Sequence, residues 1–283
     1  MNIFQGKTVG LVSPSSPPKD INKAAKRISE LGFKVVFHKL PKYLSWEGTP
    51  KQRAEQINDF FSNPEIDIIW CTRGGMGSST IIPFLDFTLI KKNPKPFIGY
   101  SDITIIQLAL QKHAELMPLQ FLMPNSNSFS ERDIINLEKV LKKEEIVWKI
   151  PRNSVIENGA AEGEIAGGCL DLLCSSMGTP HEIETDDKIF FLEDVKISPE
   201  RLYNYLHHMK FSGKFKKIKG LVFAKVPYCK NSKEHIEEFL KQFSGFPILY
   251  NLDFGHTKKK MPIMLGAKCR IDTNKKEIIL FNR

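Results

Sequence analysis

Apolar runs of strand length alternate with segments of helical periodicity through the first 124 residues of the chain. In the segments between these runs, apolar residues recur three and four positions apart, as they do on one face of an amphipathic helix. The runs lie at residues 7–12, 34–38, 66–71, 96–100 and 114–124. Regular alternation of this kind predicts a doubly wound α/β domain, in which helices cover both faces of a parallel sheet.

Two of the predicted helices have recognisable start signals. Asp20 precedes a segment with one apolar face and is the predicted N-cap of the first helix. At the start of the second, Thr49 is the predicted N-cap, Pro50 the first helical residue and Gln52 the capping-box partner.

The second half of the chain has a more mixed pattern. Residues 125–160 combine a polar stretch, one predicted helix and irregular charged sequence, which together predict a linker between domains. Beyond the linker, strands and helices alternate again, and short strands finish the chain. We therefore expect an N-terminal α/β domain at 1–124, a linker at 125–160 and a smaller C-terminal α/β domain at 161–283.

Composition narrows the class of protein. Hydrophobic residues make up 41% of the chain and charged residues 26%, as in soluble globular proteins. No apolar run approaches the roughly 18 residues that a transmembrane helix needs. The first residues lack the basic, apolar and small-residue regions of a signal peptide. We expect a cytoplasmic protein with no membrane partner.

The chain carries a net charge of +9, with lysine clusters at 91–95, 214–219 and 258–260. Such a charge attracts acidic partners, so a non-catalytic polyanion-binding protein is one hypothesis. The alternative is that these lysines form a solvated surface with no binding function. Because no nucleic-acid recognition module is present in the sequence pattern, we expect no nucleic-acid partner.

The sequence offers no support for metal chemistry. Its five cysteines include no C-x-x-C pair, and most lie in apolar runs, which predicts reduced core residues. There is no H-E-x-x-H motif of the kind that zinc peptidases use. We predict neither a metal nor a cofactor.

Three polar or glycine-rich loops follow predicted strands, at 13–18, 72–78 and 99–102. In a parallel sheet, ligands bind beyond the carboxyl ends of the strands, where these loops lie. Ser101 stands at a sharp turn between a strand and a helix, which is the position of the nucleophile in a nucleophile elbow. The usual G-x-S-x-G motif is incomplete, since residue 103 is Ile. The alternative reading of Ser101 is a helix N-cap.

Two further polar residues end apolar runs in the second half. Glu193 follows Ile-Phe-Phe-Leu at 189–192, and His256 lies in a loop after a predicted strand. A partly buried carboxylate can orient a histidine that acts as a general base. The alternatives are an exposed acid at a strand end and a surface histidine. Ser101, Glu193 and His256 follow one another in the order nucleophile, acid, base.

Five motifs in this order resemble those of the serine LD-carboxypeptidase family, which comprises muramoyltetrapeptide carboxypeptidases and microcin C immunity peptidases. They are Cys-Thr-Arg-Gly-Gly-Met-Gly at 71–77, Ile-Gly-Tyr-Ser-Asp-Ile-Thr at 98–104, Gly-Gly-Cys-Leu-Asp-Leu-Leu at 167–173, Phe-Leu-Glu-Asp-Val at 191–195 and Phe-Gly-His-Thr at 254–257. The resemblance covers nearly the whole chain, and five ordered motifs are far more specific than any one of them.

The resemblance implies a flavodoxin-like N-terminal domain and a Ser-His-Glu triad. Ser101 would be the nucleophile, His256 the general base and Glu193 its orienting acid. Backbone N–H groups of Gly75 and Asp102 are the expected oxyanion hole.

The resemblance also implies a substrate and an assembly. The family's usual substrate is the murein tetrapeptide, which is cleaved at the L,D-bond to its terminal D-alanine in peptidoglycan recycling. Because a carboxypeptidase must recognise a terminal carboxylate, Arg73 or a lysine near His256 is the expected substrate-binding residue. The family also suggests a homodimer.

Three departures from the family pattern bear on the choice of substrate. Met76 stands where an aromatic residue is usual, residues 117–124 lack an expected His-Gly-Pro, and Lys258-Lys259-Lys260 is unusually basic. None of them is a triad residue. A peptidyl-nucleotide, as in microcin C, is therefore the alternative substrate for the same machinery.

Overall fold

The computed structural model describes residues 4–124, 129–257 and 260–282, and the chain forms two compact units, 1–138 and 139–283. Lys258 and Lys259 of the basic departure lie outside the described residues. Within the described ranges, no helix is both long enough and apolar enough to cross a bilayer. The domain and linker bounds drawn from the sequence stay a prediction.

The N-terminal unit is built on parallel strands. Five of them, within the described residues, pair in the order β2-β1-β5-β6-β7, and every pairing is parallel. Their bounds are β1 (Thr8–Val12), β2 (Lys34–Val36), β5 (Ile68–Cys71), β6 (Phe97–Gly99) and β7 (Leu119–Gln120). This is the flavodoxin-like strand order, so the expected doubly wound fold is confirmed.

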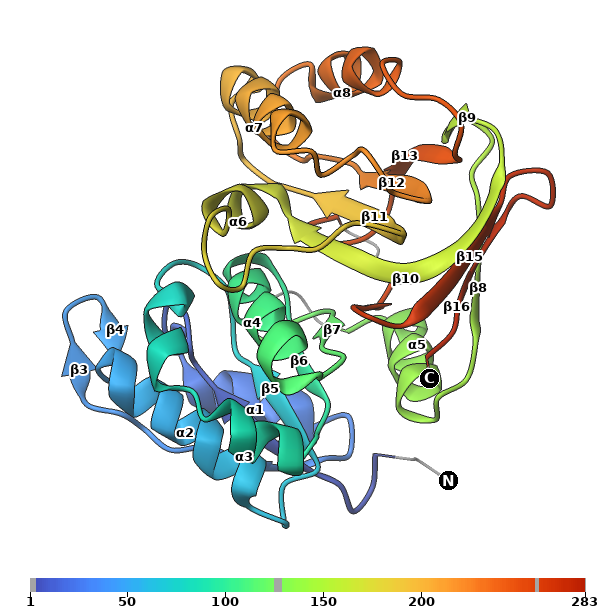
Figure 1. Cartoon of the computed structure of the whole chain (residues 1–283). Coiled ribbons are helices and arrows are strands. Elements are labelled where there is room, and N and C mark those ends of the chain that lie inside the picture. The colour runs from blue at the N-terminus through green and yellow to red at the C-terminus, as the bar shows by residue number, and fades with distance from the viewer. Residues whose placement is uncertain (1–3, 125–128, 258–259, 283) are drawn as a thin grey trace. The chain divides into compact units, whose positions relative to one another are not determined.

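Helices cover this sheet (Figure 1). They are α1 (Ile21–Ser29), α2 (Pro50–Ser62), α3 (Phe87–Lys92) and α4 (Thr104–Ala114), with a 3-10 helix at Ser78–Phe84. The predicted helix starts are confirmed. Asp20 accepts hydrogen bonds from the first turn of α1, and Thr49 forms a capping box with Gln52 at the start of α2. A hairpin of β3 (Lys42–Tyr43) and β4 (Trp46–Glu47), which the apolar pattern did not predict, joins β2 to α2.

The C-terminal unit contains a mixed sheet in which eight strands, among the described residues, pair in the order β8-β16-β15-β10-β11-β12-β13-β9. Its middle strands, β10 to β13, are parallel, and antiparallel strands flank them. The strands are β8 (Ile146–Lys149), β9 (Val155–Glu157), β10 (Ala160–Cys169), β11 (Lys188–Glu193), β12 (Gly220–Ala224), β13 (Ile248–Leu252), β15 (Lys268–Asp272) and β16 (Glu277–Leu280). The short β14 (Ile263–Met264) precedes β15.

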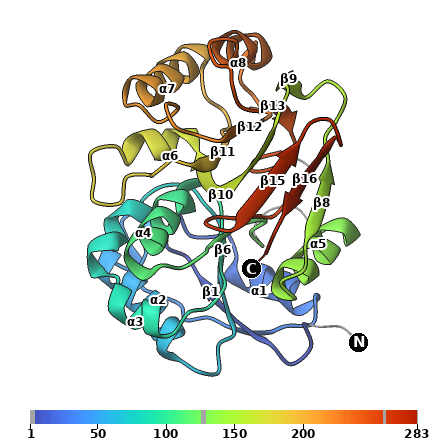
Figure 2. The same cartoon turned by 45° about the vertical axis from the view of Figure 1, so that its right-hand side comes forward.

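Figures 1 and 2 show α7 (Pro199–Phe211) and α8 (Ser232–Leu240) beside β12 and β13, with α6 (Leu170–Ser175) directly after the long, curved β10. The remaining helix, α5 (Glu131–Leu141), runs across the division between the units.

Two strands of this sheet come from the range expected to be a linker. Strand β8 pairs with β16, and β9 pairs with β13, both antiparallel. In β8, Ile146 and Trp148 are buried while Val147 is half exposed, which is the alternation of a strand with one buried face. With these strands included, the C-terminal unit comprises residues 139–283.

Gly167 lets β10 approach β11 closely, shortly before the carboxyl end of the strand pair. It has a φ of 151°, and a Cβ there would lie 1.9 Å from the carbonyl oxygen of Phe191. The two strands run in register to the pair Cys169–Glu193. The position of Glu193 therefore depends on a backbone approach that only glycine permits.

We predict that Gly167→Ala strongly destabilises the protein, by more than about 3 kcal/mol, because a backbone strand must move to admit the methyl group. Gly178→Ala is the matched control, since Gly178 also has a positive φ, of 76°, but a Cβ there would have no neighbouring atom within 4 Å. It should cost only about 1–2 kcal/mol. Denaturant unfolding of both full-length variants measures the difference, and equal losses would contradict the steric argument.

Candidate active site

Ser101 lies at the turn between β6 and α4. Its φ is 67°, a left-handed conformation that non-glycine residues rarely adopt and that costs about 1–2 kcal/mol. The N-cap positions of the 3-10 turn Ser101–Ile103 and of α4 are Tyr100 and Ile103, with no side-chain cap bond at either. The alternative reading of Ser101 as a helix cap is therefore wrong. A strained serine between strand and helix is the geometry of a nucleophile elbow.

The glycine loop after β5 packs directly against this serine. A Cβ on Gly74 would lie 2.8 Å from Cβ and 2.9 Å from Oγ of Ser101, so only glycine fits there. A Cβ on Gly75, whose φ is 131°, would instead lie 2.2 Å from Oγ of Ser16. Both glycines thus let the backbone pass close to a neighbouring group: Gly74 to Ser101, and Gly75 to the loop after β1. The Gly75 N–H as an oxyanion donor stays a prediction.

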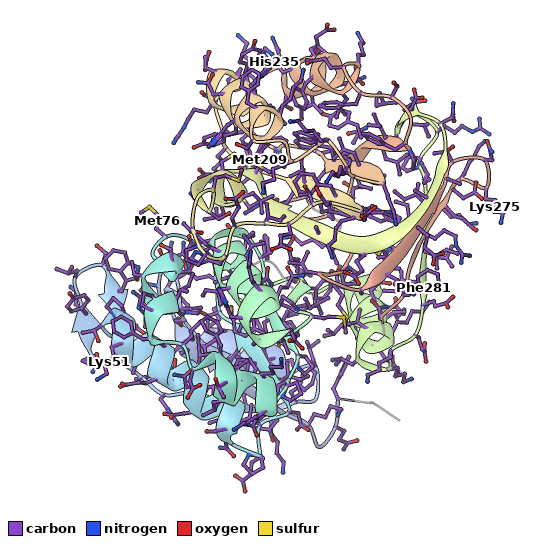
Figure 3. The ribbon with its side chains drawn as sticks, in the orientation of Figure 1. Lys51, Met76, Met209, His235, Lys275 and Phe281 are labelled. Carbon is purple, nitrogen blue, oxygen red and sulfur yellow. The ribbon has the colours of Figure 1, made fainter. Side chains whose placement is uncertain are left out.

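Arg73 lies on the same loop and folds back along it. Its Nε donates to the Gly74 carbonyl over 3.1 Å, and a terminal nitrogen donates to the Pro17 carbonyl over 3.4 Å. Both partners are neutral carbonyl oxygens, so neither of these bonds neutralises the positive charge of the guanidinium. Met76 lies two positions after Gly74 in the same loop. It is 71% exposed and is labelled in Figure 3.

Glu193 and His256 form a bonded pair within the C-terminal unit. Glu193 ends β11 and has no exposed surface. Its Oε2 accepts the Nδ1 of His256 at 2.6 Å and the backbone N–H of His256 at 3.1 Å. The His256 side chain is 14% exposed. The alternatives of an exposed strand-end acid and a surface histidine are therefore both wrong.

This hydrogen bond fixes the chemistry of the imidazole. With the carboxylate ionised, Oε2 can only accept, so Nδ1 of His256 carries a proton. The neutral imidazole then has its lone pair on Nε2, which is the atom that can take a proton from a nucleophile. The bonded pair therefore has the arrangement expected of an oriented general base.

The loop that carries His256 is anchored by its neighbours. Phe254 is buried, and its ring lies 5.4 Å from that of Phe191 and 6.1 Å from that of Trp148. Gly255 has a φ of 63°, and a Cβ there would lie 2.3 Å from Oε2 of Glu193. Glycine before the histidine thus lets the main chain pass over the carboxylate.

A second acid lies beside Glu193. Asp194 is buried and accepts hydrogen bonds from the backbone N–H groups of Val195, at 2.7 Å, and Asp171, at 3.1 Å. Burial and the neighbouring charge of Glu193 raise the pKa of Asp194 to about 7. Burial also raises the pKa of the nearby Cys169 thiol well above its usual value, which disfavours a thiolate at this position. All five cysteines are free, and four are buried, as predicted.

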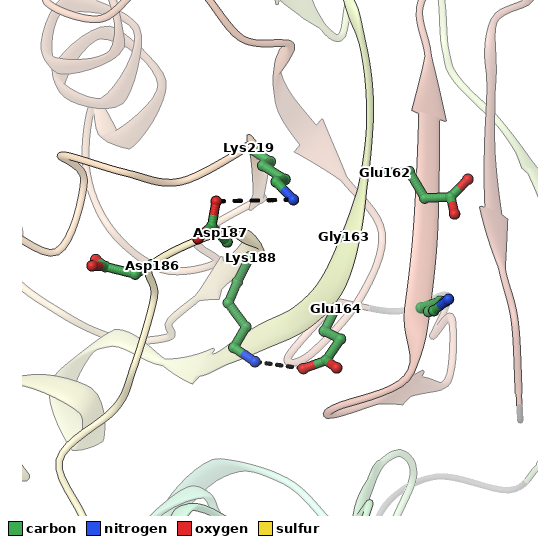
Figure 4. A pocket seen from close by; sticks show the side chains of 8 residues that line it. Glu162, Gly163, Glu164, Asp186, Asp187, Lys188 and Lys219 are labelled. Atoms are coloured by element: carbon green, nitrogen blue, oxygen red, sulfur yellow. Dashed lines mark hydrogen bonds and ion pairs between the residues drawn. The ribbon is translucent and has the colours of Figure 1, made fainter.

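The C-terminal unit has pockets at both ends of its parallel strands. One, of about 410 Å³, is shown in Figure 4 and lies at the amino ends of β11 and β12. There Lys188 pairs with Glu164 and Lys219 with Asp187, so its charges compensate one another. Another, of about 440 Å³, lies at the carboxyl ends of β12 and β13 and is lined by Thr257, the neighbour of His256. The second pocket is at the end of the sheet where Glu193 lies.

The structure thus groups the predicted site residues by unit. Ser101, Asp102, Arg73 and the glycine loop lie together in the N-terminal unit, and Glu193 lies against His256 in the C-terminal unit. Sequence reasoning missed Gly255. A glycine directly before a candidate histidine was the available signal for it.

Known proteins resemble this chain over almost its full length. A protein of Bacillus subtilis (strain 168) named "Probable murein peptide carboxypeptidase" is 31% identical, over 98% of this chain and 92% of its own. The "Microcin C7 self-immunity protein MccF" of Escherichia coli is 28% identical, over 96% of this chain and 92% of its own. The solved structure of MccF in complex with glutamyl sulfamoyl guanosine matches with a TM-score of 0.89 and 25% identity, over 98% of this chain and 96% of that chain.

Two family descriptions match the two halves of the chain. The LD-carboxypeptidase N-terminal domain matches residues 9–120, which include the elbow and the glycine loop. The LD-carboxypeptidase C-terminal domain matches residues 162–271, which include the bonded acid and histidine. The chain therefore belongs to the LD-carboxypeptidase family of serine peptidases.

Proposed function

We propose that the protein hydrolyses the L,D-peptide bond to the terminal D-alanine of murein tetrapeptide through a triad of Ser101, His256 and Glu193. The observation that carries this proposal is the 2.6 Å hydrogen bond from His256 to a fully buried glutamate. Ser101, strained at a strand-to-helix turn, supports its role as the nucleophile.

The reaction follows the logic of acyl transfer. The Ser101 hydroxyl attacks the carbonyl carbon of the L-centre while Nε2 of His256 takes its proton. The tetrahedral intermediate then collapses, the bond to D-alanine breaks, and His256 returns the proton to the leaving amine. Water hydrolyses the resulting ester with His256 again as base, which releases the shortened peptide and restores the serine.

The proposed oxyanion donors are the backbone N–H groups of Asp102 and Gly75. Removal of one such donor typically raises the barrier by about 2.7–4 kcal/mol. The close packing of Gly74 on Ser101 supports this assignment, because it keeps the glycine loop beside the attacking oxygen.

Arg73 is the proposed reader of the substrate's terminal carboxylate. Among the described residues, its hydrogen bonds run to neutral carbonyl oxygens, which do not neutralise its charge. Several lysines, by contrast, are paired with acids: Lys214 with Glu182, Lys217 with Asp186 and Lys225 with Asp253. Paired lysines in the 214–219 cluster also weaken the polyanion-binding hypothesis, because their charge is locally compensated.

A peptidyl-nucleotide hydrolase is the second candidate function. It is favoured by the similarity to MccF, whose solved structure carries glutamyl sulfamoyl guanosine. The same three residues would act, and only the leaving group would differ. Competition between murein tetrapeptide and an aminoacyl sulfamoyl nucleoside distinguishes the two, and preference for the nucleoside would overturn the first proposal.

The proposal also covers the cellular compartment and the oligomeric state of the enzyme. Hydrolysis of murein fragments in the cytoplasm fits peptidoglycan recycling, and we propose that the protein acts there as a homodimer. Fractionation of cells and light scattering of the purified protein test these two points.

We predict that Ser101→Ala abolishes release of D-alanine from the tetrapeptide, with a loss in kcat of about 10⁴-fold or more. Glu193→Gln should lower kcat by about 10⁴-fold, because an amide can present its NH₂ group to His256 and favour the wrong tautomer.

Chromatographic detection of free D-alanine measures the activity of both variants. Full activity of Ser101→Ala would refute the mechanism, and loss of wild-type activity in EDTA would indicate a metal peptidase instead.

The raised pKa of Asp194 predicts how stability depends on pH. Between its ordinary value of 3.8 and about 7, the folded protein keeps a proton that the unfolded chain releases. The folded state therefore binds more protons, so this residue makes stability fall as pH rises through that window. Asp194→Asn should flatten the fall in Tm between about pH 4 and pH 7.

Asp186→Asn is the control for that measurement, since it removes an exposed acid of the same unit. Any constant loss of stability from an altered hydrogen bond shifts the whole curve and leaves its slope unchanged. If Asp194→Asn instead shows the same slope of Tm against pH as the wild type, Asp194 is ionised in the folded protein throughout this pH range.

A further inference from the structure

We propose that the carboxylate of Asp102 is a positioning group that fastens the nucleophile turn to the two neighbouring loops. Its backbone N–H was assigned above to the oxyanion hole, and the side chain has a separate task. The inference rests on the proposed function, because it concerns how the same site is held in place.

The contacts of this carboxylate are short and buried. Its Oδ2 accepts the hydroxyl of Ser15 at 2.6 Å and the backbone N–H of Ser78 at 3.0 Å. The hydroxyl of Ser78 donates in turn to the backbone carbonyl of Asp102 at 2.5 Å. Asp102 is 7% exposed, and the two serines have no exposed surface. Hydrogen bonds to a charged group are stronger than neutral ones, so these contacts are well suited to fix a loop.

The three partners come from three different strand ends. Ser15 lies in the loop after β1, Ser78 ends the loop after β5, and Asp102 follows the turn after β6. These strands are neighbours in the parallel sheet, so their carboxyl ends meet at one edge. One carboxylate thus ties together the nucleophile turn, the glycine loop and the serine loop.

A buried cation also bonds two of these loops, the one after β1 and the one after β5. Arg53 donates from Nη1 to the Pro14 carbonyl at 2.5 Å and from Nη2 to the Thr80 hydroxyl at 3.1 Å. These two acceptors stand within two residues of Ser15 and Ser78. Burial lowers the pKa of Arg53, and the negative charge of Asp102 opposes that change. Two of the three loops therefore contact both Arg53 and Asp102, whose opposite charges stabilise one another.

The site needs such fastening because its geometry is otherwise unfavourable. Ser101 has a left-handed backbone, which persists only where surrounding contacts maintain it. Gly74 must also stay within contact of Ser101 for the loop to face the reacting carbonyl. A displacement of about 1 Å in such an arrangement can lower the rate by about 100-fold.

The test compares four variants of the full chain. Asp102→Ala removes the acceptor and should lower kcat by about 100-fold with little change in KM, because the defect is in alignment. Asp102→Asn keeps an oxygen that can accept both bonds, so it should recover much of that loss. Ser15→Ala removes the bond to the carboxylate and a 3.4 Å contact with the Met76 carbonyl, and Ser78→Ala removes the bond to the Asp102 carbonyl. Each should give a smaller loss, of about 10-fold.

Ser176→Ala is the matched control. Ser176 is also fully buried and donates one hydrogen bond, to the Leu173 carbonyl at 2.7 Å, but it lies in the other unit. It should leave kcat unchanged. If Asp102→Ala does not fold, the two serine variants measured against this control still decide the question.

Hydrogen exchange separates this inference from the proposed function. Peptides covering 13–18 and 72–80 should exchange faster in Asp102→Ala and Ser15→Ala, and at the wild-type rate in Ser101→Ala. That readout requires no substrate, so it holds even if the wild type releases no D-alanine. Unchanged exchange in Asp102→Ala and Ser15→Ala, or a loss of kcat in Ser176→Ala equal to that in Ser15→Ala, would overturn the positioning role.

Discussion

The hydrogen bond between His256 and the buried carboxylate of Glu193 is the constraint that fixes the geometry of the proposed general base. An ionised carboxylate without exposed surface is costly unless nearby donors compensate its charge. Here His256 donates to it twice, from the ring and from the main chain, both to Oε2. The other oxygen, Oε1, is buried and has no hydrogen-bond partner among the described residues. Among the described residues, the hydrogen bonds to this carboxylate therefore come from His256 alone.

The two units position their predicted site residues in a similar way. Each has parallel strands at the centre of its sheet and a predicted site residue at or just after the carboxyl end of a buried strand: Ser101 follows β6, and Glu193 is the last residue of β11. Each also uses a glycine to let backbone pass close to that group, Gly74 in one unit and Gly255 in the other. Strands covered by helices are rigid supports, so side chains at their ends are well positioned for chemistry.

Local signals explain how much of this could be predicted from sequence. The parallel core and the turn at Ser101 follow from residues adjacent in the chain, and so do the caps of α1 and α2. The contact between Glu193 and His256 spans 63 residues and depends on the strand order β11-β12-β13, which periodicity does not specify. Their order in the chain and the family motifs suggested it. The bond from Ser15 to Asp102 spans 87 residues and joins polar side chains that each look like ordinary loop residues.

The strands missed in the expected linker have a related cause. A strand at the edge of a sheet is short and buries only one face, so its pattern is weak against charged surroundings. Strand β9 has only three residues, Val-Ile-Glu, each of them part-exposed. Such a strand is specified by its partner β13 more than by its own composition.

The predicted site residues of each unit also have features that a fold selected for stability alone would avoid. Ser101 has a left-handed backbone, Glu193 is a buried carboxylate, and Asp194 beside it has a raised pKa because two acids share one buried region. Each feature is maintained by contacts outside the reacting atoms: Asp102 and Arg53 in one unit, Phe254 and Gly255 in the other. Because Ser101 and Glu193 are members of the proposed triad, the supporting residues should tolerate less change than ordinary structural residues.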